Sequence, residues 1–262
     1  MDIQGRADIA ATIAREAGAL ALKYFQAQDS LRVERKGHQD FVSQADREVE
    51  TAVRNALMAA FPDDAIVGEE HAPRPGTSGV TWVIDPIDGT TNFINGIPAW
   101  TVVLAGVFDG KTQIGVIYDP CHDEMYSTVR SQGSVLNGRR LQMASDRKLA
   151  EGTVGVGFSN RTSTKGVDRL VSGLLAEGGV FYRNASGALS LAYVAAGRLL
   201  GYAEDHMNAW DCLAGQLLVA EAGGVVEDQD ADAMIAHGGR VIVASPMVFP
   251  DLLRLSEVAF AP

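Results

Sequence analysis

The fold is decided by Val80-Thr81-Trp82-Val83-Ile84-Asp85-Pro86-Ile87-Asp88-Gly89-Thr90-Thr91-Asn92-Phe93. Its first five residues are apolar and predict a buried strand. Asp85 and Asp88 follow that strand with Pro86 between them, and two carboxylates this close cannot both be buried without partners. A divalent cation is the simplest partner, and a solvated acidic turn is the alternative, since Asp, Pro and Gly all favour turns. The stretch therefore predicts part of a metal site at a strand end.

The composition is that of a globular protein and excludes several functional classes. The chain has 262 residues, 47% of them hydrophobic and 21% charged, which fits one large domain or two lobes that share a core. Its net charge of −11 argues against nucleic acid or an anionic membrane as a partner. There is no apolar run of transmembrane length and no signal-peptide pattern, and two cysteines are too few for a disulfide framework. We therefore expect a cytoplasmic protein.

Hydrophobic periodicity predicts an α/β chain of two lobes. Helices are expected over 3–26 and over 44–60, the second with Ser43 as N-cap and Asp46 in a capping box. Residues 99–142 predict an antiparallel meander with tight turns at Asp109-Gly110 and Asn137-Gly138. Strands and helices alternate after about residue 150. We expect an N-terminal lobe over 1–144 and a C-terminal α/β lobe over 145–262.

Further acids stand at other predicted element ends. Glu69 follows the predicted strand 65–67, and strand ends are where α/β proteins bind ligands. Asp211 opens the predicted helix 210–222, although an acid at a helix N-terminus is favourable by itself. If Glu69 and Asp211 converge with Asp85 and Asp88, four carboxylates without cysteine or histidine describe a site for Mg²⁺ or Mn²⁺, not Zn²⁺.

The chemistry expected at such a site is phosphoryl transfer. Two ions about 4 Å apart can clamp the attacking and leaving oxygens of that reaction. A helix that begins after Gly89 would add free N–H groups that bind a phosphate. One stretch would then supply metal ligands and phosphate donors together, which favours hydrolysis of a phosphate ester over metal storage.

Three motifs in this chain resemble the inositol monophosphatase family. They are Gly68-Glu69-Glu70, Asp85–Phe93, and Trp210-Asp211 with the following Glu221-Ala222-Gly223-Gly224. They occur in the family's order, and the similarity covers about residues 30–226. The resemblance implies an α/β (α+β) fold arranged as a layered αβαβα sandwich of the sugar-phosphatase type, usually a homodimer. It also implies dependence on roughly two or three Mg²⁺ ions per site, with Mn²⁺ as a substitute, and frequent inhibition by Li⁺.

The resemblance also implies roles for individual residues. The metal ligands would be Glu69, Asp85, the carbonyl of Ile87, Asp88 and Asp211. The catalytic residues would be Glu69, Thr90, Asp46 and Asp88. Substrate would contact Gly89, Thr90, Ser186, Gly187, Glu204 and Asp211. Lys36 and Asp40 match a family stretch that shapes a mobile loop at the site.

The expected function is hydrolysis of a phosphate monoester of a small polyol by metal-activated water, with myo-inositol monophosphate as the first expectation. Fructose-1,6-bisphosphatase, histidinol-phosphate phosphatase and 3′-phosphonucleotide phosphatase are alternatives within the superfamily. A catalytically idle, metal-binding regulatory relative is the alternative from another class. Residues 183–188 and 205–209 depart from the family pattern, so they leave the substrate open, and His206 is either a substrate contact or a solvated residue.

Overall fold

The computed structural model describes residues 2–37, 40–144, 146–159 and 161–261, with backbone only at 30, 35–37, 40 and 41. The side chains of Lys36 and Asp40, for which the sequence predicts a role in a mobile loop, therefore lie outside the described part.

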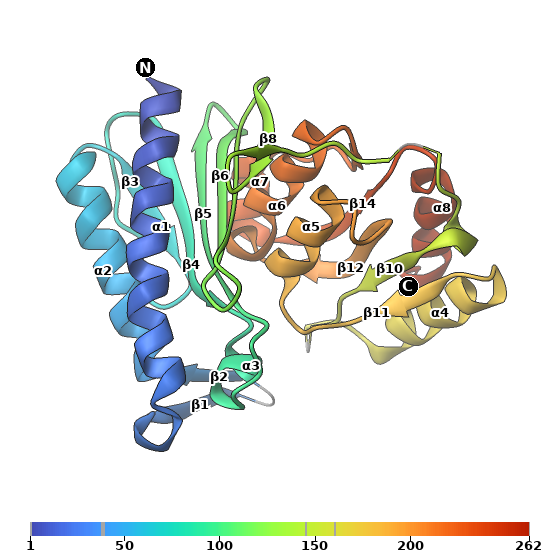
Figure 1. The fold of residues 1–262 in the computed structure, drawn as a ribbon, viewed down its shortest axis with the longest axis horizontal. Helices are drawn as coiled ribbons and strands as arrows, with labels where there is room; N and C mark the ends of the chain where they lie inside the picture. The colour runs from blue at the N-terminus through green and yellow to red at the C-terminus, as the bar shows by residue number, and fades with distance from the viewer. Residues whose placement is uncertain (1, 38–39, 145, 160, 262) are drawn as a thin grey trace.

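The elements form five layers that alternate helices and sheets (Figure 1). One outer layer holds α1 (Ile3–Gln26) and α2 (Gln44–Ala60), which pack on a seven-stranded sheet. The central layer holds α5 (Gly187–Ala195) and α6 (Ala209–Glu221). A five-stranded sheet follows, and α4 (Thr164–Ala176) and α8 (Phe249–Ala259) cover its far face. The predicted αβαβα sandwich is confirmed.

The larger sheet is mostly antiparallel and contains the predicted meander. Its order is β3 (Ala65–Gly68), β4 (Val80–Asp88), β5 (Thr101–Phe108), β6 (Lys111–Asp119), β7 (Glu124–Val129), β8 (Gly133–Leu136) and β9 (Arg139–Arg140). Only β3 and β4 pair in parallel among the neighbours of this sheet. The carboxyl ends of β3 and β4 consequently lie side by side, and Glu69 follows the first of them.

The smaller sheet is mixed. Its order is β11 (Val180–Tyr182), β10 (Thr153–Val156), β12 (Gly201–Met207), β14 (Gly239–Ala244) and β13 (Val225–Val226). A separate pair joins β1 (Val33–Gly37) to β2 (Asp40–Ser43). The hydrophobic pattern of the sequence did not predict several short elements. These are most of α3 (Thr90–Ile94), of which only the start was expected, α7 (Ala231–His237), β13, and the single turns η1 (Gln28–Ser30) and η2 (Leu149–Glu151).

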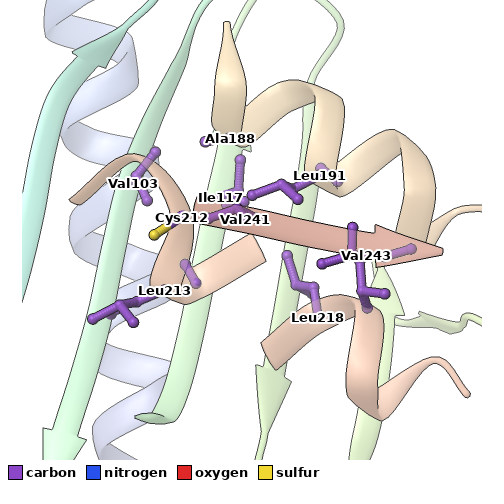
Figure 2. Close-up of a cluster of buried hydrophobic side chains, with 14 of the residues drawn as sticks. Val103, Ile117, Ala188, Leu191, Cys212, Leu213, Leu218, Val241 and Val243 are labelled. Carbon is purple, nitrogen blue, oxygen red and sulfur yellow. The ribbon is translucent and has the colours of Figure 1, made fainter. Parts of the chain in front are cut away.

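The strands of the larger sheet read as continuous apolar runs because both faces of the sheet are covered by helices. On β5, Val102 and Leu104 face the core beneath α1 and α2, whereas Val103, Ala105 and Val107 face α5 and α6. Figure 2 shows Val103 and Ile117 of this sheet with Ala188, Leu191, Cys212, Leu213 and Leu218 of the central helices and Val241 and Val243 of β14. The central core thus joins elements from both predicted lobes, and the boundary at 144/145 stays a prediction.

Glycines bring α6 unusually close to its neighbours. A Cβ on Gly115 of β6 would lie 2.7 Å from the carbonyl oxygen of Ala214, and a Cβ on Gly215 would lie 2.7 Å from Cδ1 of Leu191. Real Cβ atoms do not approach other atoms so closely. Gly115 thus lets α6 approach β6, and Gly215 lets it approach α5, while Asp211 lies in the first turn of α6.

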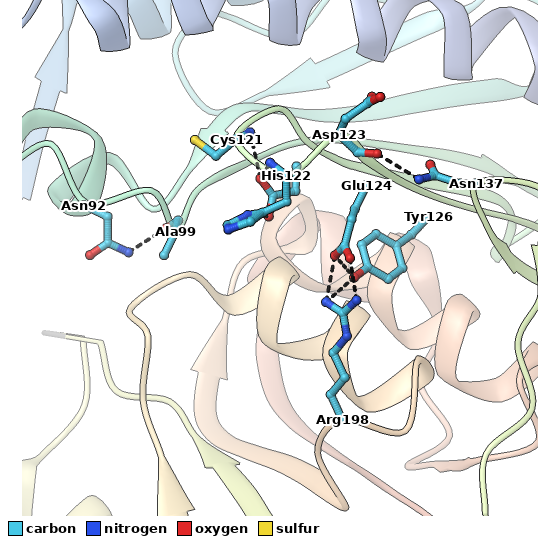
Figure 3. Close-up of polar contacts among 10 residues, drawn as sticks. Asn92, Ala99, Cys121, His122, Asp123, Glu124, Tyr126, Asn137 and Arg198 are labelled. Atoms are coloured by element: carbon cyan, nitrogen blue, oxygen red, sulfur yellow. Dashed lines mark hydrogen bonds and ion pairs between the residues drawn. The ribbon is translucent and has the colours of Figure 1, made fainter.

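Polar contacts tie the meander to the loop after α5 (Figure 3). Arg198 makes an ion pair with Glu124 and donates a hydrogen bond to the Tyr126 hydroxyl at 3.0 Å. In the turn after β6, the buried carboxylate of Asp119 accepts the backbone N–H of Cys121 at 2.9 Å and contacts the His122 ring at 2.8 Å. Burial raises the pKa of the Cys121 thiol to about 12, which disfavours a reactive thiolate.

Within the described ranges, no helix has both the length and the apolar character that crossing a membrane requires.

Candidate metal and phosphate site

A bulge at the end of β4 brings Asp85 and Asp88 to one side of the sheet. Asp85 pairs with Val103 and Asp88 with Thr101, so the two residues between the acids on β4 lie opposite a single residue of β5. In a regular strand, residues three apart point to opposite faces, and the extra residue of a bulge corrects this. Pro86 suits the position because it has no N–H to donate to the ladder.

Glu69, Asp85 and Asp211 form an acidic cluster from three distant segments. Each offers a carboxylate oxygen, and these oxygens all lie within 4.8 Å of one another. Burial raises the pKa of Asp85 well above its usual value, and the charges of Glu69, Asp88 and Asp211 raise it further. Burial, then Asp88 and Glu204, likewise raise the pKa of Asp211 to about 7. The cluster holds more negative charge than the protein alone neutralises.

This donor set fits a hard divalent cation. Carboxylate oxygens are the ligands that Mg²⁺ and Mn²⁺ prefer, whereas zinc sites are usually built on cysteine or histidine. The charges of Glu69, Asp88 and Asp211 raise the pKa of Asp85, and the charge of Asp88 raises that of Asp211, so a cation at this position is favourable. The cluster could therefore hold a metal ion.

Asp88 is placed differently from the other three acids. Its carboxylate accepts the Ser186 hydroxyl, the N–H of Gly187 at 3.2 Å and the N–H of Ala188 at 2.9 Å. These donors form the N-terminus of α5, where an anion is favourable. Asp88 lies near the cluster, since its charge raises the pKa of both Asp85 and Asp211. It therefore joins the two halves of the chain as well as adding charge to the site.

Asp46 serves as a cap and as a site residue at once. Its Oδ2 accepts the Ser43 N–H at 2.8 Å and the Ser43 hydroxyl at 2.6 Å, which completes the predicted capping box of α2. Its Oδ1 lies 3.1 Å from Oγ1 of Thr90, which is also 3.1 Å from the carbonyl oxygen of Ile87. Burial raises the pKa of Asp46 to about 6. The capping role and the site role that the sequence indicates for Asp46 are therefore compatible in one carboxylate.

Gly89 is required by the backbone at the start of α3. Its φ is +98°, and a Cβ would lie 2.9 Å from the carbonyl oxygen of Ala99 and 3.2 Å from Cβ of Ser186. The sequence attributed this glycine to the approach of an oxyanion, whereas the structure shows that the turn and its packing already demand it. Phe93 fixes the same turn, because its ring packs edge-on against Trp100 with centroids 4.9 Å apart.

Glu204 lies opposite the cluster on β12. It is 8% exposed, and the Tyr202 hydroxyl donates to its Oε2 at 2.6 Å. Burial raises the pKa of Glu204 to about 7. Its strand, β12, continues to Met207, which still pairs with Gly239 of β14.

A cavity of about 140 Å³ lies beside the acidic cluster, and Glu69, Asp85, Gly89 and Thr90 are not among the residues that line it. Asp88, Glu204 and Asp211 line it together with Ser186 and Gly187, so these five predicted site residues share one cavity. The polar groups of Ser186 and Gly187 are engaged by Asp88, as described above, and are therefore held within the fold.

His206 does not line this cavity. Its Nε2 lies 3.1 Å from the carbonyl oxygen of His237, and its buried Nδ1 has no hydrogen-bond partner among the described residues. Between the two readings left open by the sequence, the structure favours the one without a substrate contact.

Arg161 and Tyr202 also line the cavity and were missed in the sequence, whereas Arg183 belongs to the stretch 183–188 that was expected to bear on the substrate. The charges of both arginines lower the pKa of Glu204. A Cβ on Gly157 would collide with the Glu204 carboxylate and the Tyr202 hydroxyl, so this glycine makes room for both. No spacing signal marks these positions, because the residues after β10 approach β12 through the parallel pairing of these two strands, which are distant in the sequence.

Comparison with known proteins agrees with the site. The inositol monophosphatase family matches residues 2–257. The chain is 38% identical to "Nus factor SuhB" of Escherichia coli strain K12 over 250 residues, which covers 94% of this chain and 93% of that protein. It is 38% identical to "Inositol-1-monophosphatase" of Mesorhizobium japonicum over 244 residues, which covers 92% of each.

A solved structure supports the same assignment. The extragenic suppressor protein suhB from Bartonella henselae has a TM-score of 0.89 and 33% identity, with 95% of this chain and 97% of that chain covered. From the net charge, we expected no nucleic-acid partner. The similarity to a protein named a Nus factor does not support that expectation. The family match over nearly the whole chain, the relatives and the layered fold agree with the three motifs in the sequence, and the chain belongs to the inositol monophosphatase family.

Proposed function

We propose that this protein is a Mg²⁺-dependent phosphatase that hydrolyses a phosphate monoester of a small polyol, and that myo-inositol monophosphate is the first substrate to test. The observation that carries the proposal is the convergence of Glu69, Asp85 and Asp211 within 4.8 Å beside a polar cavity. Membership of the inositol monophosphatase family supports a phosphatase.

Glu69, Asp85 and Asp211 would hold the ions, with Asp88 and the carbonyl of Ile87 as further ligands. When bound, Mg²⁺ supplies positive charge that polarises the phosphate ester and lowers the pKa of a coordinated water. Phosphoryl transfer needs little covalent chemistry from a protein, so the chain contributes mainly position and electrostatics.

Thr90 and Asp46 are proposed to orient the attacking water. The Thr90 hydroxyl has one proton, which it shares between Asp46 and the carbonyl of Ile87. Its oxygen therefore has a lone pair with which it can accept a hydrogen bond from a water. Because Ser43 also binds Asp46 through two donors, the direction of the Thr90 hydroxyl is fixed by α2.

The substrate would lie between α3 and β12. The backbone N–H groups of Gly89 and Thr90 are proposed to bind phosphate oxygens, and Glu204 to accept hydrogen bonds from the polyol. The Tyr202 hydroxyl holds Glu204 in place. A substrate with a second anionic group, such as fructose 1,6-bisphosphate, is the second candidate, because Arg161 and Arg183 line the same cavity.

The test is kcat/KM over a panel of myo-inositol 1-phosphate, fructose 1,6-bisphosphate, histidinol phosphate and a 3′-phosphonucleotide. Each is assayed for phosphate release with Mg²⁺, with Mn²⁺ and with added Li⁺, beside Glu69→Gln as an inactive control. We expect the inositol ester to be preferred and Li⁺ to inhibit. Magnesium binding without release of phosphate from any ester would instead support an idle regulatory relative.

A homodimer is proposed from the family resemblance, and light scattering coupled to size-exclusion chromatography tests it.

A further inference from the structure

Helix α2 contains a buried ion pair that takes no part in the chemistry proposed above. Nε of Arg54 donates to Oε1 of Glu50 at 2.7 Å, one helical turn away. Glu50 is fully buried and Arg54 is 9% exposed. Burying two charges is unfavourable unless the remaining donors and acceptors of both side chains are also satisfied.

The backbone that follows Glu69 satisfies them. The Glu50 carboxylate accepts the N–H of Glu70 at 2.7 Å and the N–H of His71 at 3.2 Å. The Arg54 guanidinium donates to the carbonyl oxygens of His71 and Ala72, both at 3.1 Å. Two side chains of one helix thus bind two successive N–H groups and two successive carbonyls.

These contacts enclose Glu69 from both sides. The pairing of β3 with β4 ends at Gly68 opposite Ile84, so Glu69 is the first residue beyond the ladder. Gly68 packs directly against Glu50, because a Cβ there would lie 2.8 Å from Cδ of Glu50. Glu50 therefore contacts the residue before Glu69 and the N–H of the residue after it.

The Glu69 side chain belongs to the acidic cluster with Asp85 and Asp211. Fixing the peptide groups on either side of Glu69 limits the backbone dihedrals that set the direction of that side chain. β3 is the edge strand of its sheet, and in the described part of the chain its outer side pairs through an isolated bridge between Ile66 and Arg74, outside residues 68–72.

We propose that Glu50 and Arg54 are positioning residues that act through the backbone of residues 68–72 to hold the Glu69 carboxylate at the metal site. The inference rests on the proposed function, because it takes Glu69 as a metal ligand. Partners that orient a ligand group raise metal affinity, because the ligand no longer has to be ordered when the ion binds.

A purely structural role of the ion pair is the competing explanation, and the chain offers a matched control. Arg6 makes a partly buried ion pair with Asp64, which directly precedes β3. Breaking that pair perturbs the same strand at its other end. Arg6→Met should therefore destabilise the fold without changing the direction of Glu69.

The experiment titrates Mn²⁺ into the metal-free full chain and measures its Kd by electron paramagnetic resonance. The variants are Glu50→Gln, Arg54→Met, Arg6→Met and Glu69→Gln, each kept well below its melting temperature. We expect Glu50→Gln and Arg54→Met to raise Kd by about 10–100-fold, the range typical of partners that orient metal ligands. Arg6→Met should stay within about twofold of the unmodified protein, as expected for a distant site.

Backbone amide exchange supplies a second readout. Because Glu50 accepts the N–H groups of Glu70 and His71, Glu50→Gln should accelerate exchange at these two amides beyond the change in global stability. If Glu50→Gln fails to fold, Arg54→Lys decides by the same titration, since lysine keeps the charge but lacks the planar fork that reaches two carbonyls.

The outcomes separate the two proposals. Unchanged Mn²⁺ affinity in Glu50→Gln and Arg54→Met, with affinity lost in Glu69→Gln, overturns the positioning role and leaves the metal site standing. Unchanged affinity in Glu69→Gln overturns both, because Glu69 is then no ligand. A Kd raised equally in Arg6→Met also overturns the positioning role, since the effect would then follow from stability alone.

Discussion

Raising the pH from about 5 to about 8 should destabilise the metal-free protein, because buried acids at the site must then ionise without a counter-charge. Burial raises the pKa of Glu204 and of Asp211 to about 7 and that of Asp46 to about 6. In the unfolded chain these groups lose their protons near pH 4. Between the two values the folded protein binds more protons, so the free energy of unfolding falls as pH rises.

A magnitude can be worked from Glu204. Glu204 is 8% exposed and Asp46 is 1% exposed, so solvent screens neither strongly. The pKa of Glu204 rises from 4.5 to about 7. At 1.36 kcal/mol for each pKa unit, Glu204 alone destabilises the folded state by about 3 kcal/mol above pH 7. For a chain of this size, about 3 kcal/mol corresponds to a decrease of roughly 6–12 °C in Tm.

The assay is thermal unfolding followed by circular dichroism at several pH values, in EDTA and in saturating Mg²⁺. In EDTA, these groups should leave the free energy of unfolding undiminished below about pH 4.5. It should then fall as the pH rises through about 6–7. Mg²⁺ should abolish most of this dependence, so its stabilising effect should grow with pH. Glu204→Gln is the matched variant and should flatten the EDTA profile.

A Tm in EDTA that stays constant or increases between about pH 5 and pH 8 would refute the reasoning. So would a stabilisation by Mg²⁺ that is the same at both ends of this range, because the cation would then not be replacing protons at the acidic cluster.

Three substitutions make further predictions. Asp88→Asn should reduce kcat by about 100-fold or more. It should also lower Tm, since an amide cannot accept from all three donors of α5. Near-normal turnover of myo-inositol 1-phosphate would show that the role of Asp88 is misassigned. Gly89→Ala should lower the free energy of unfolding in urea by about 1–3 kcal/mol, because φ is +98° and Ala99 is close, and an unchanged midpoint would contradict this. Thr90→Val should lower kcat by about 100-fold with little change in KM, whereas Thr90→Ser should retain activity; equal losses in both variants would argue against a role of the hydroxyl.

Local sequence patterns predicted most of the helices and strands and named the acids of the cluster, whereas the layered αβαβα arrangement was implied by the family resemblance. The capping box of Ser43 and Asp46 lies within four residues, and the apolar run before Asp85 is a strand as expected. These features depend on contacts between near neighbours, so their residue types are sufficient to predict them. From the sequence, the convergence of Glu69, Asp85 and Asp211 could be stated only as a condition for a metal site. The parallel pairing of β3 with β4 explains why Glu69 and Asp85 come together.

Contacts between distant segments could not be predicted in the same way. Asp88 accepts three donors that lie 98–100 residues away, at the start of α5. No pattern in the sequence marks Arg54, although its guanidinium binds the carbonyls of His71 and Ala72. Such partners depend on how layers pack, and neither propensity nor spacing encodes that packing.

The central claim is that the acidic cluster makes this protein a metal-dependent phosphatase. Its most direct test is the rate of phosphate release from myo-inositol 1-phosphate as a function of Mg²⁺ concentration, for the unmodified chain and for Asp85→Asn. Asp85 is chosen because it is 2% exposed and lies in the cluster with Glu69 and Asp211. We predict release that saturates with Mg²⁺, that EDTA abolishes, and that Asp85→Asn reduces by about 100-fold or more. Release that persists in EDTA, or that Asp85→Asn leaves unchanged, would contradict the account.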